Sequence, residues 1–329
     1  MMTLRTFLSR ATLAVSLTAA TGAVFAPSAT HAAAPQVRSQ APGFYRMMLG
    51  DFEVTVISDG TVPQQPDKLL TNTHPEHVKK LLADAYLELP VETSVNAFLI
   101  NTGSKLVLVD TGAGELFGPG IKGLNKLVPN LRAAGYEPEQ IDAVLLTHIH
   151  TDHSGGLTVG GKQVFSKALV YADKRDVDYW LSTDNMEKAP ADKKPRFQEA
   201  RTALDSYVAA GRLKTFEGDT ELFPGIRAIA TPGHTPGHSF YSVESKGQRL
   251  VLWGDVMHVA AVQFPEPSVT IQYDVDSKAA AAQRAKAYAD AAKQGYWVGV
   301  AHVSFPGLGH VRANGKGYTW VPANYSTGQ

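Results

Sequence analysis

Cysteine is absent from this sequence. The chain can therefore form no disulfide bond, even in an oxidising compartment where such bonds persist. It also has no thiolate to offer a metal ion, so any bound metal must be held by nitrogen and oxygen atoms. Histidine and the carboxylates are left as the side chains to examine for metal chemistry.

An excess of charge of either sign is also lacking, because 31 basic residues balance 31 acidic ones. A nucleic-acid-binding surface needs a basic track that neutralises phosphates, and the sequence shows none. We therefore expect no nucleic acid among the partners. Hydrophobic residues make up 44% of the chain, which is ample for a sizeable core.

Long apolar runs are lacking except near the N-terminus. Residues 1–34 combine two early arginines, an apolar run over 11–26 and a small-residue stretch before Pro35. This order is typical of a cleaved signal peptide, and the run is short for a transmembrane helix. We expect its removal on export to the periplasm or beyond, which leaves 29 basic and 31 acidic residues and no membrane span.

Repeats, low-complexity tracts and linkers are missing as well, so residues 35–329 are predicted to form a single domain. Strand-like stretches alternate with helical ones in both halves of this region. That alternation favours an α/β fold in which two mixed β-sheets are sandwiched between helices, an αββα sandwich.

The sequence does contain a dense histidine motif, THIHTDH, at residues 147–153. It follows the apolar run 143–146, which predicts a buried strand. In extended chain His148 and His150 face the same side, as two ligands of one metal ion would. Asp152 and His153 lie just past the turn and can reach a second ion. A solvated polar loop is the alternative, but three histidines within six residues are hard to attribute to chance.

Four further segments accompany this motif: VLVDTG at 107–112, TPGHTPGH at 231–238, Gly254–Asp255 and Ala301–His302. In this order they resemble the motifs of the metallo-β-lactamase superfamily. Within it, the likeness is strongest to methyl parathion hydrolases and their lactonase and arylesterase relatives, through residues 101–112 and 304–307.

The resemblance implies a set of ligands for two divalent metal ions. They are His148, His150 and His234 for the first ion and Asp152, His153 and His302 for the second, with Asp255 bridging. His238 is the alternative to His234, but the preceding Thr-Pro-Gly favours His234, and His238 is expected to be structural, as is His310. Asp110 is implied to orient a ligand. Nitrogen and oxygen donors suit Zn²⁺, with Mn²⁺, Co²⁺ or Fe²⁺ as alternatives.

Two such ions, about 3.5–4 Å apart, lower the pKa of a shared water, so that a metal-bridging hydroxide can attack a carbonyl or phosphoryl centre. We take Asp152 and Asp255 as the catalytic residues. The expected substrate pocket is formed by Phe117, Trp180, Phe197, His258 and Tyr273. Phe117 lies in a glycine-rich loop, where packing and a pocket lip are equally compatible. The inserted segment 182–196 is expected to form a lid.

His258 and Tyr273 place polar groups where the resemblance implies aliphatic ones in a phosphotriesterase. Such groups suit hydrogen bonding to a lactone or ester oxygen. We therefore expect a metal-dependent hydrolase of lactones or aryl esters with phosphotriesterase side activity. A dedicated organophosphate hydrolase is the alternative, and a non-catalytic zinc-binding protein would need the ligands without a pocket. The substrate is a small molecule, and a homodimer is left open.

Overall fold

The computed structural model describes residues 34–118 and 120–327 of the chain. The predicted signal peptide, apart from its last residue, lies outside the described residues. Met1–Gln40 and Ala41–Gln329 form separate units, and in the first of them residues 34–40 have no helix or strand.

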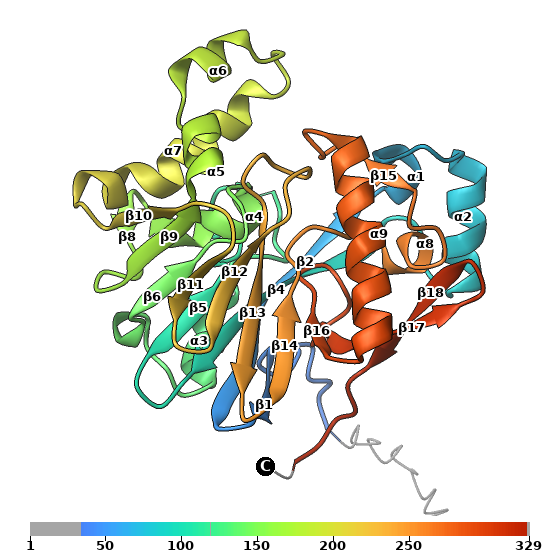
Figure 1. Ribbon diagram of the computed structural model, residues 1–329, viewed down its shortest axis with the longest axis horizontal. Helices are drawn as coiled ribbons and strands as arrows, with labels where there is room; N and C mark the ends of the chain where they lie inside the picture. The colour runs from blue at the N-terminus through green and yellow to red at the C-terminus, as the bar shows by residue number, and fades with distance from the viewer. Residues whose placement is uncertain (1–33, 119, 328–329) are drawn as a thin grey trace, which may run out of the picture. The chain divides into compact units, whose positions relative to one another are not determined.

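A seven-stranded sheet is formed by the N-terminal part of the second unit, in the order β1-β2-β4-β5-β6-β9-β10 (Figure 1). The strands are β1 (Phe44–Leu49), β2 (Phe52–Gln64), β4 (Val91–Asn101), β5 (Leu106–Val109), β6 (Ala143–Leu145), β9 (Leu169–Asp173) and β10 (Leu213–Phe216). Pairing is antiparallel from β1 to β5 and parallel from β5 to β10. The carboxyl ends of β5, β6 and β9 therefore meet at one edge.

A second seven-stranded sheet, in the order β11-β12-β13-β14-β16-β17-β18, comes from the C-terminal part. Its strands are β11 (Thr220–Phe223), β12 (Ile226–Ala230), β13 (Ser239–Ser245), β14 (Gln248–Leu252), β16 (Trp297–Gly299), β17 (Leu308–Asn314) and β18 (Gly317–Pro322). β14 and β16 pair in parallel and the other neighbours are antiparallel. Val109 and Leu145 of the first sheet share one apolar cluster with Tyr241 and Leu252 of the second. The two sheets thus pack face to face.

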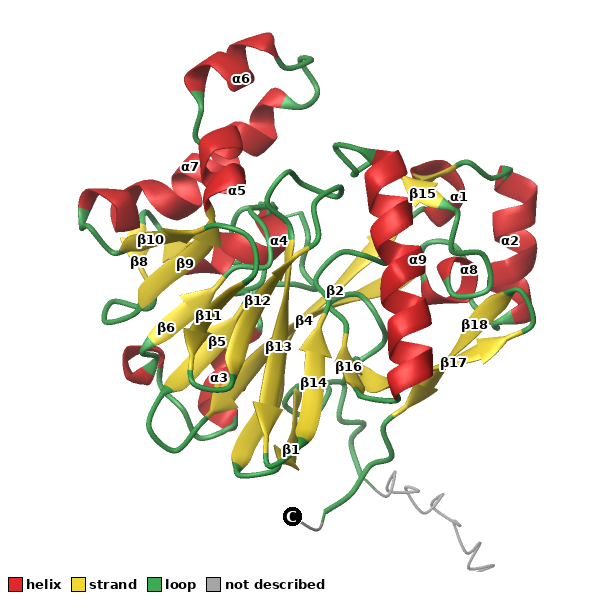
Figure 2. Ribbon diagram, in the orientation of Figure 1, coloured by secondary structure: helices red, strands yellow, loops and turns green. Residues whose placement is uncertain are grey.

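Helices flank the two sheets, and one short helix, α6, projects beyond them (Figure 2). Those associated with the first sheet are α3 (Leu127–Ala133), α4 (Thr151–Ser154), α5 (Lys174–Trp180), α6 (Thr183–Lys188) and α7 (Lys194–Ala209). The others are α1 (Pro66–Leu69), α2 (Pro75–Asp84), α8 (Ala260–Gln263) and α9 (Ser277–Gln294). Leu204 of α7 shares an apolar cluster with Val144 of the first sheet, and Tyr288 of α9 stacks on Trp253. The predicted αββα sandwich of two mixed sheets is confirmed.

Short elements complete the unit. β3 (Leu70–Thr71) pairs with β15 (Thr270–Ile271), and β7 (Thr158–Val159) with β8 (Lys162–Gln163). Two 3-10 turns, η1 (Pro138–Gln140) and η2 (Gly155–Leu157), flank the segment that carries the histidine motif. None of the helices in the described ranges is long and apolar enough to cross a membrane.

One strand is longer than the sequence pattern predicts. The alternation over 52–58 followed by Asp59–Gly60 predicts a strand end, but β2 continues to Gln64 through a register shift between Ser58 and Gly60. Gly60 has φ +115°, and a Cβ there would lie 1.9 Å from the carbonyl oxygen of Gly123. The glycine permits a close approach of two backbones within a continuing strand, which is a common role of glycine at a bulge.

Candidate metal centre

The predicted metal ligands are delivered by strand ends of both sheets. β6 ends at Leu145 and leads into the loop with His148 and His150, after which α4 carries Asp152 and His153. In the other sheet His234 follows β12, Asp255 follows β14 and His302 follows β16. The carboxyl ends of these strands face the same region, so seven side chains from distant parts of the sequence converge.

The seven side chains form two groups of four that share one member. The groups are His148, His150, His234 and Asp255, and Asp152, His153, Asp255 and His302. Within each group, one nitrogen or oxygen atom from every residue lies within 4.8 Å of the others. Six of the seven are buried, and Asp152 is partly exposed. The structure thus brings together every residue that the sequence motifs single out as a ligand.

Asp255 divides its two carboxylate oxygens between the groups. Its Oδ2 lies 3.7 Å from Nε2 of His148 and 3.4 Å from Nε2 of His234. Its Oδ1 lies 3.0 Å from Nε2 of His153 and 3.1 Å from Nε2 of His302. This is the geometry expected of a carboxylate that bridges two ions. The preceding Gly254 has φ +52°, and a Cβ there would lie 2.8 Å from Thr147, so glycine is required beside the carboxylate.

Four of the histidines are oriented through the ring nitrogen that faces away from the centre. Nδ1 of His153 contacts Oδ2 of Asp110, and Nδ1 of His234 contacts Oδ1 of Asp274, both at 2.8 Å. Nδ1 of His302 lies 2.9 Å from the carbonyl of Ser94, and Nδ1 of His148 lies 3.1 Å from the Thr147 hydroxyl. Such contacts fix a ring's orientation and leave Nε2 for the metal.

Asp110 has the orienting role that the family resemblance implies. It does not belong to either group of candidate ligands. Its Oδ1 accepts the backbone N–H of Thr147 and its Oδ2 accepts the Thr147 hydroxyl, both at 2.8 Å. One carboxylate therefore holds the start of the histidine motif and the ring of His153 together.

The polar atoms at the centre are better satisfied by coordination to divalent metal ions than by hydrogen bonds to one another. Nε2 of His153 and Oδ1 of Asp255 are buried and have no hydrogen-bond partner among the described residues. Nδ1 of His150 lies 3.0 Å from Nε2 of both His148 and His234. Buried polar atoms without partners are costly. A coordinated ion would satisfy these lone pairs, and nitrogen with carboxylate oxygen is a donor set that zinc accepts.

Electrostatics favours the metal-binding protonation state for some of these groups and opposes it for others. Burial would lower the pKa of His153, His234 and His302, but Asp255 and other nearby carboxylates raise it, so a metal ion must displace a proton from these three rings. Burial and the neighbouring imidazoles hold the pKa of His148 and His150 well below the ordinary value, so both rings are neutral. Burial would raise the pKa of Asp255, but the surrounding histidines hold it well below its usual range. Neutral imidazoles and an ionised carboxylate are the forms that ligate metals.

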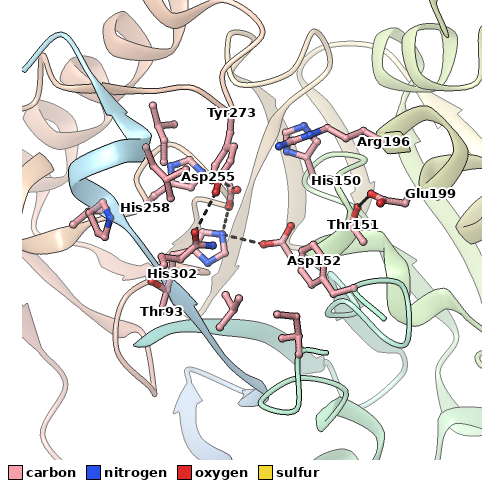
Figure 3. Close-up of a pocket in the computed structure, with 18 of the residues that line it drawn as sticks. Thr93, His150, Thr151, Asp152, Arg196, Glu199, Asp255, His258, Tyr273 and His302 are labelled. Carbon is pink, nitrogen blue, oxygen red and sulfur yellow. Dashed lines mark hydrogen bonds and ion pairs between the residues drawn. The ribbon is translucent and has the colours of Figure 1, made fainter. Parts of the chain in front are cut away.

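An open cavity of about 400 Å³ lies against the centre (Figure 3). His150, Asp152, Asp255 and His302 contribute to its lining, together with apolar residues such as Ile271. Three of the five predicted pocket residues also border it: Phe117, His258 and Tyr273. Phe117 is 39% exposed, which places it at the rim and supports the pocket-lip interpretation.

Trp180 and Phe197 lie elsewhere than predicted. Both are buried in the core under α5 and α7, with 4.9 Å between their ring centroids. They border a second cavity of about 410 Å³, which shares His150, Arg196 and Tyr273 with the first. The indole of Trp180 meets the ring of His150 edge-on at 5.2 Å. Trp180 therefore supports a candidate ligand and does not form a wall of the first cavity.

Tyr273 also differs in part from the sequence-based interpretation. The Tyr273 hydroxyl donates a hydrogen bond to Oε1 of Gln64 at 3.1 Å. Its proton is therefore not available to a substrate. His258 has Nε2 at 3.1 Å from Oδ2 of Asp255, while its Nδ1 is buried with no hydrogen-bond partner among the described residues. Because Asp255 is ionised, Nε2 of His258 donates to it, and Nδ1 of the neutral ring is left as a free acceptor.

Several contributing residues had escaped the sequence analysis. Asp274 orients the ring of His234. Asp176 accepts the backbone N–H groups of Ile149 and Gly237 at 2.9 and 2.5 Å. It thereby connects the histidine motif to the turn that carries His234. Burial raises the pKa of Asp176 to about 6. Arg196 and Glu199 line the first cavity. No local motif marks these residues, since their partners are remote in sequence.

The remaining histidines have the structural roles expected of them. Nε2 of His238 accepts the backbone N–H of Asp255 at 3.0 Å, and its Nδ1 lies 2.8 Å from the Thr231 hydroxyl. His238 thus holds the bridging carboxylate's backbone without being one of the candidate ligands. His310 packs on Trp297, with 4.1 Å between ring centroids.

A sequence profile of the metallo-beta-lactamase superfamily matches residues 90–294. This match covers more than half of the chain, and the chain belongs to that superfamily. N-acyl homoserine lactonases of Bacillus cereus and Bacillus thuringiensis are 28% and 26% identical over 171 residues, or 47% of this chain. The match spans about 60% of the length of these relatives.

Two solved structures are similar over most of the described fold. AbOPH, a hydrolase in the beta-lactamase superfamily, has a TM-score of 0.83 at 37% identity and covers 88% of this chain and 100% of its own. AidC, a dizinc quorum-quenching lactonase, has a TM-score of 0.80 at 25% identity, with coverages of 87% and 99%. With the histidine and aspartate cluster, these likenesses make the centre a candidate dinuclear site for divalent metal ions.

Proposed function

We propose that this protein is a dinuclear metal-dependent hydrolase that cleaves lactones or aryl esters, with phosphotriesterase side activity. One observation carries the proposal: two sets of four ligand atoms share Asp255 and lie at the side of an open cavity. A non-catalytic zinc-binding protein would need the ligands alone, and the cavity argues against it.

Some of the residues would hold the ions, and others would contact the substrate. His148, His150 and His234 would hold one ion, Asp152, His153 and His302 the other, and Asp255 both. When bound, such ions supply a nucleophile at neutral pH and polarise the bond under attack. Asp110 and Asp274 hold the rings of His153 and His234 in place, and His258 contributes a polar ring to the cavity wall. Zinc is the metal we propose, with manganese, cobalt or iron as alternatives.

The lactone or ester preference rests on His258 and on the relatives. A polar ring beside the bridging carboxylate, with an Nδ1 that can accept a hydrogen bond, suits a polar ester or lactone better than an aliphatic side chain would. N-acyl homoserine lactonases are among the similar proteins. The alternative is a dedicated organophosphate hydrolase, which is favoured by the largely apolar residues that make up much of the cavity wall, including Val62, Leu69 and Ile271.

The test is a substrate panel on protein that has been stripped of metal and reloaded with zinc, manganese or cobalt. The panel contains an N-acyl homoserine lactone, a 4-nitrophenyl ester and a neutral phosphotriester. We expect kcat/KM to be highest for the lactone or the aryl ester. A wide preference for the phosphotriester would support the alternative, and no hydrolysis of any class by protein holding two ions would overturn the proposal.

We also propose export, because the N-terminal 34 residues have the order of charge, apolar run and small residues described above. The mass of the protein recovered from the periplasm or medium tests this. A mature chain that begins near Pro35 is expected, and a full-length cytoplasmic product would overturn it.

A further inference from the structure

Arg196 is a cation without a protein anion beside it. It lies in the first turn of α7 and borders both cavities, next to His150 and Tyr273 (Figure 3). Its guanidinium carbon stands 5.1 Å from the centroid of the Tyr273 ring. Within the described ranges its guanidinium has no ion pair or hydrogen bond. A partly buried guanidinium is normally paired with a carboxylate or phosphate, so its planar fork of donors is available to a ligand.

The acidic groups near Arg196 are engaged elsewhere or out of reach. Glu199 accepts the hydroxyl of Thr151, and Asp274 is paired with His234 at 2.8 Å. Asp192 lines the first cavity, but it lies beyond ion-pair distance of Arg196, as Glu199 does. The arginine therefore keeps its charge uncompensated at the junction of the two cavities.

The second cavity adds further cations and an unsatisfied donor. Lys188 and Lys193 border it with Arg196, and Lys193 reaches only the carbonyl of Gln272, at 3.4 Å. Its aromatic side is formed in part by Trp180, whose Nε1 is buried with no acceptor among the described residues. Three cations, an aromatic wall and a free N–H make a site for an anion with an apolar stem.

We propose that the second cavity binds a carboxylate carried by the substrate, and that Arg196 is the specificity-determining residue for it. The inference rests on the proposed function, because the ester or lactone end would occupy the first cavity beside Asp152 and Asp255. His150, Arg196 and Tyr273 border both cavities, so one extended molecule can span them. The substrate class is then an ester or lactone with an acidic arm.

The first experiment compares matched esters on the zinc-loaded protein, with rates corrected for spontaneous hydrolysis. The mono-4-nitrophenyl esters of glutarate and adipate carry the carboxylate, and 4-nitrophenyl pentanoate and hexanoate lack it. We expect kcat/KM at least tenfold higher for an acidic ester than for its neutral partner. Arg196→Gln should remove most of this preference, because the acidic ester should lose at least tenfold more in kcat/KM, mainly through KM, than its neutral partner. Arg196→Lys should retain part of the preference.

Lys194→Gln is the matched control, since Lys194 lies in the same turn, borders neither cavity and gives the same change of charge. It should keep the preference. Equal hydrolysis of acidic and neutral esters by the parent would overturn the inference. So would an equal loss on both classes in Arg196→Gln, because Arg196 would then act on the group that all esters share.

A binding measurement separates this inference from the proposed function. Calorimetric titration of the zinc-loaded protein with glutarate and with pentanoate compares two carboxylates with one, and needs no turnover. The parent and Lys194→Gln should bind glutarate at least tenfold more tightly than pentanoate. Arg196→Gln should bind the two ligands about equally. If this holds while no ester is cleaved, the proposed function fails and the anion site stands. If neutral esters are cleaved and glutarate has no advantage, the anion site fails alone.

Discussion

Single residues outside the ligand set decide how well the centre holds its ions. Asp274 contacts Nδ1 of His234 at 2.8 Å and is itself buried. Asp274→Asn removes the charge that orients this ring and makes it more basic. Changes of this kind typically cost about 10- to 100-fold in metal affinity. Competition with a chromogenic chelator measures the loss, and Asp84→Asn on the exposed face of α2 is the control. Unchanged affinity would show that the backbone alone positions His234.

His258 is the residue on which the substrate class depends. Leucine at this position removes the buried polar ring at the cavity wall and leaves the ligands in place. His258→Leu should lower kcat/KM for a lactone by about 10- to 100-fold, or about 1.4–2.7 kcal/mol of transition-state binding. A neutral phosphotriester should keep or gain rate. Tyr273→Phe is the comparison, with a smaller effect because its hydroxyl already donates to Gln64. A parallel fall for both substrates would mean that His258 supports the centre itself.

At the scale of elements, one buried arginine of α9 hydrogen-bonds to the segment that carries His258. Arg284 donates to the carbonyls of Val256, Pro267 and Val269 at 2.6, 2.9 and 2.5 Å and is fully buried. Arg284→Met leaves three carbonyls without this donor. Breaking such a network costs about 3 kcal/mol or more. Urea unfolding measures the loss, and Lys286→Met on the exposed side of α9 should change stability little. Equal stabilities would show that water replaces the arginine.

The junction of β2 with α3 predicts a pH dependence of stability. Asp59 accepts the N–H groups of Ala113, Lys126 and Leu127, yet burial raises its pKa from 3.8 to about 6. Between pH 4 and 6 the unfolded chain releases this proton while the folded chain keeps it. The free energy of unfolding therefore falls as pH rises, by about 3 kcal/mol for a shift of this size, and the loss is complete above pH 6.

Asp59→Asn isolates this effect, because its side chain does not titrate. Urea unfolding of parent and variant at equal metal content, from pH 4 to 7, gives the difference between them. The parent's advantage over the variant should shrink by up to about 3 kcal/mol across this range. A constant difference would contradict the raised pKa of Asp59.

For the whole molecule, metal binding couples the two halves of the sandwich. Ligands from 148–153 leave the first sheet, and His234, Asp255 and His302 leave the second. An ion that binds only the folded protein raises the free energy of unfolding. The increase grows with the logarithm of the ratio of the ion concentration to its Kd. Chelation should abolish hydrolysis and lower Tm by several degrees, and zinc, manganese or cobalt should restore both. Full activity and an unchanged Tm in protein verified to be metal-free would exclude the two-metal centre.

The sequence by itself determined much of this protein. Runs such as 143–146 are apolar enough to be buried strands in any context, and ligands such as His148, His150 and His153 lie within one short motif. Gly295 ends α9 with φ +69°, as its place after an alanine-rich helix predicts. These features depend on residues close together in the chain. Local pattern and local steric preference are therefore enough to predict them.

Only the tertiary structure decided the rest. The strands β1 and β18 lie at sheet edges, where exposed faces weaken the apolar pattern, and they are defined by their partners. Trp180 and Phe197 were expected in one pocket, but the packing of α5 against α7 places them in another. Asp274 and Arg196 gain their roles from groups dozens of residues away. Such contacts arise from the way strands and helices assemble, so no sequence window contains the information.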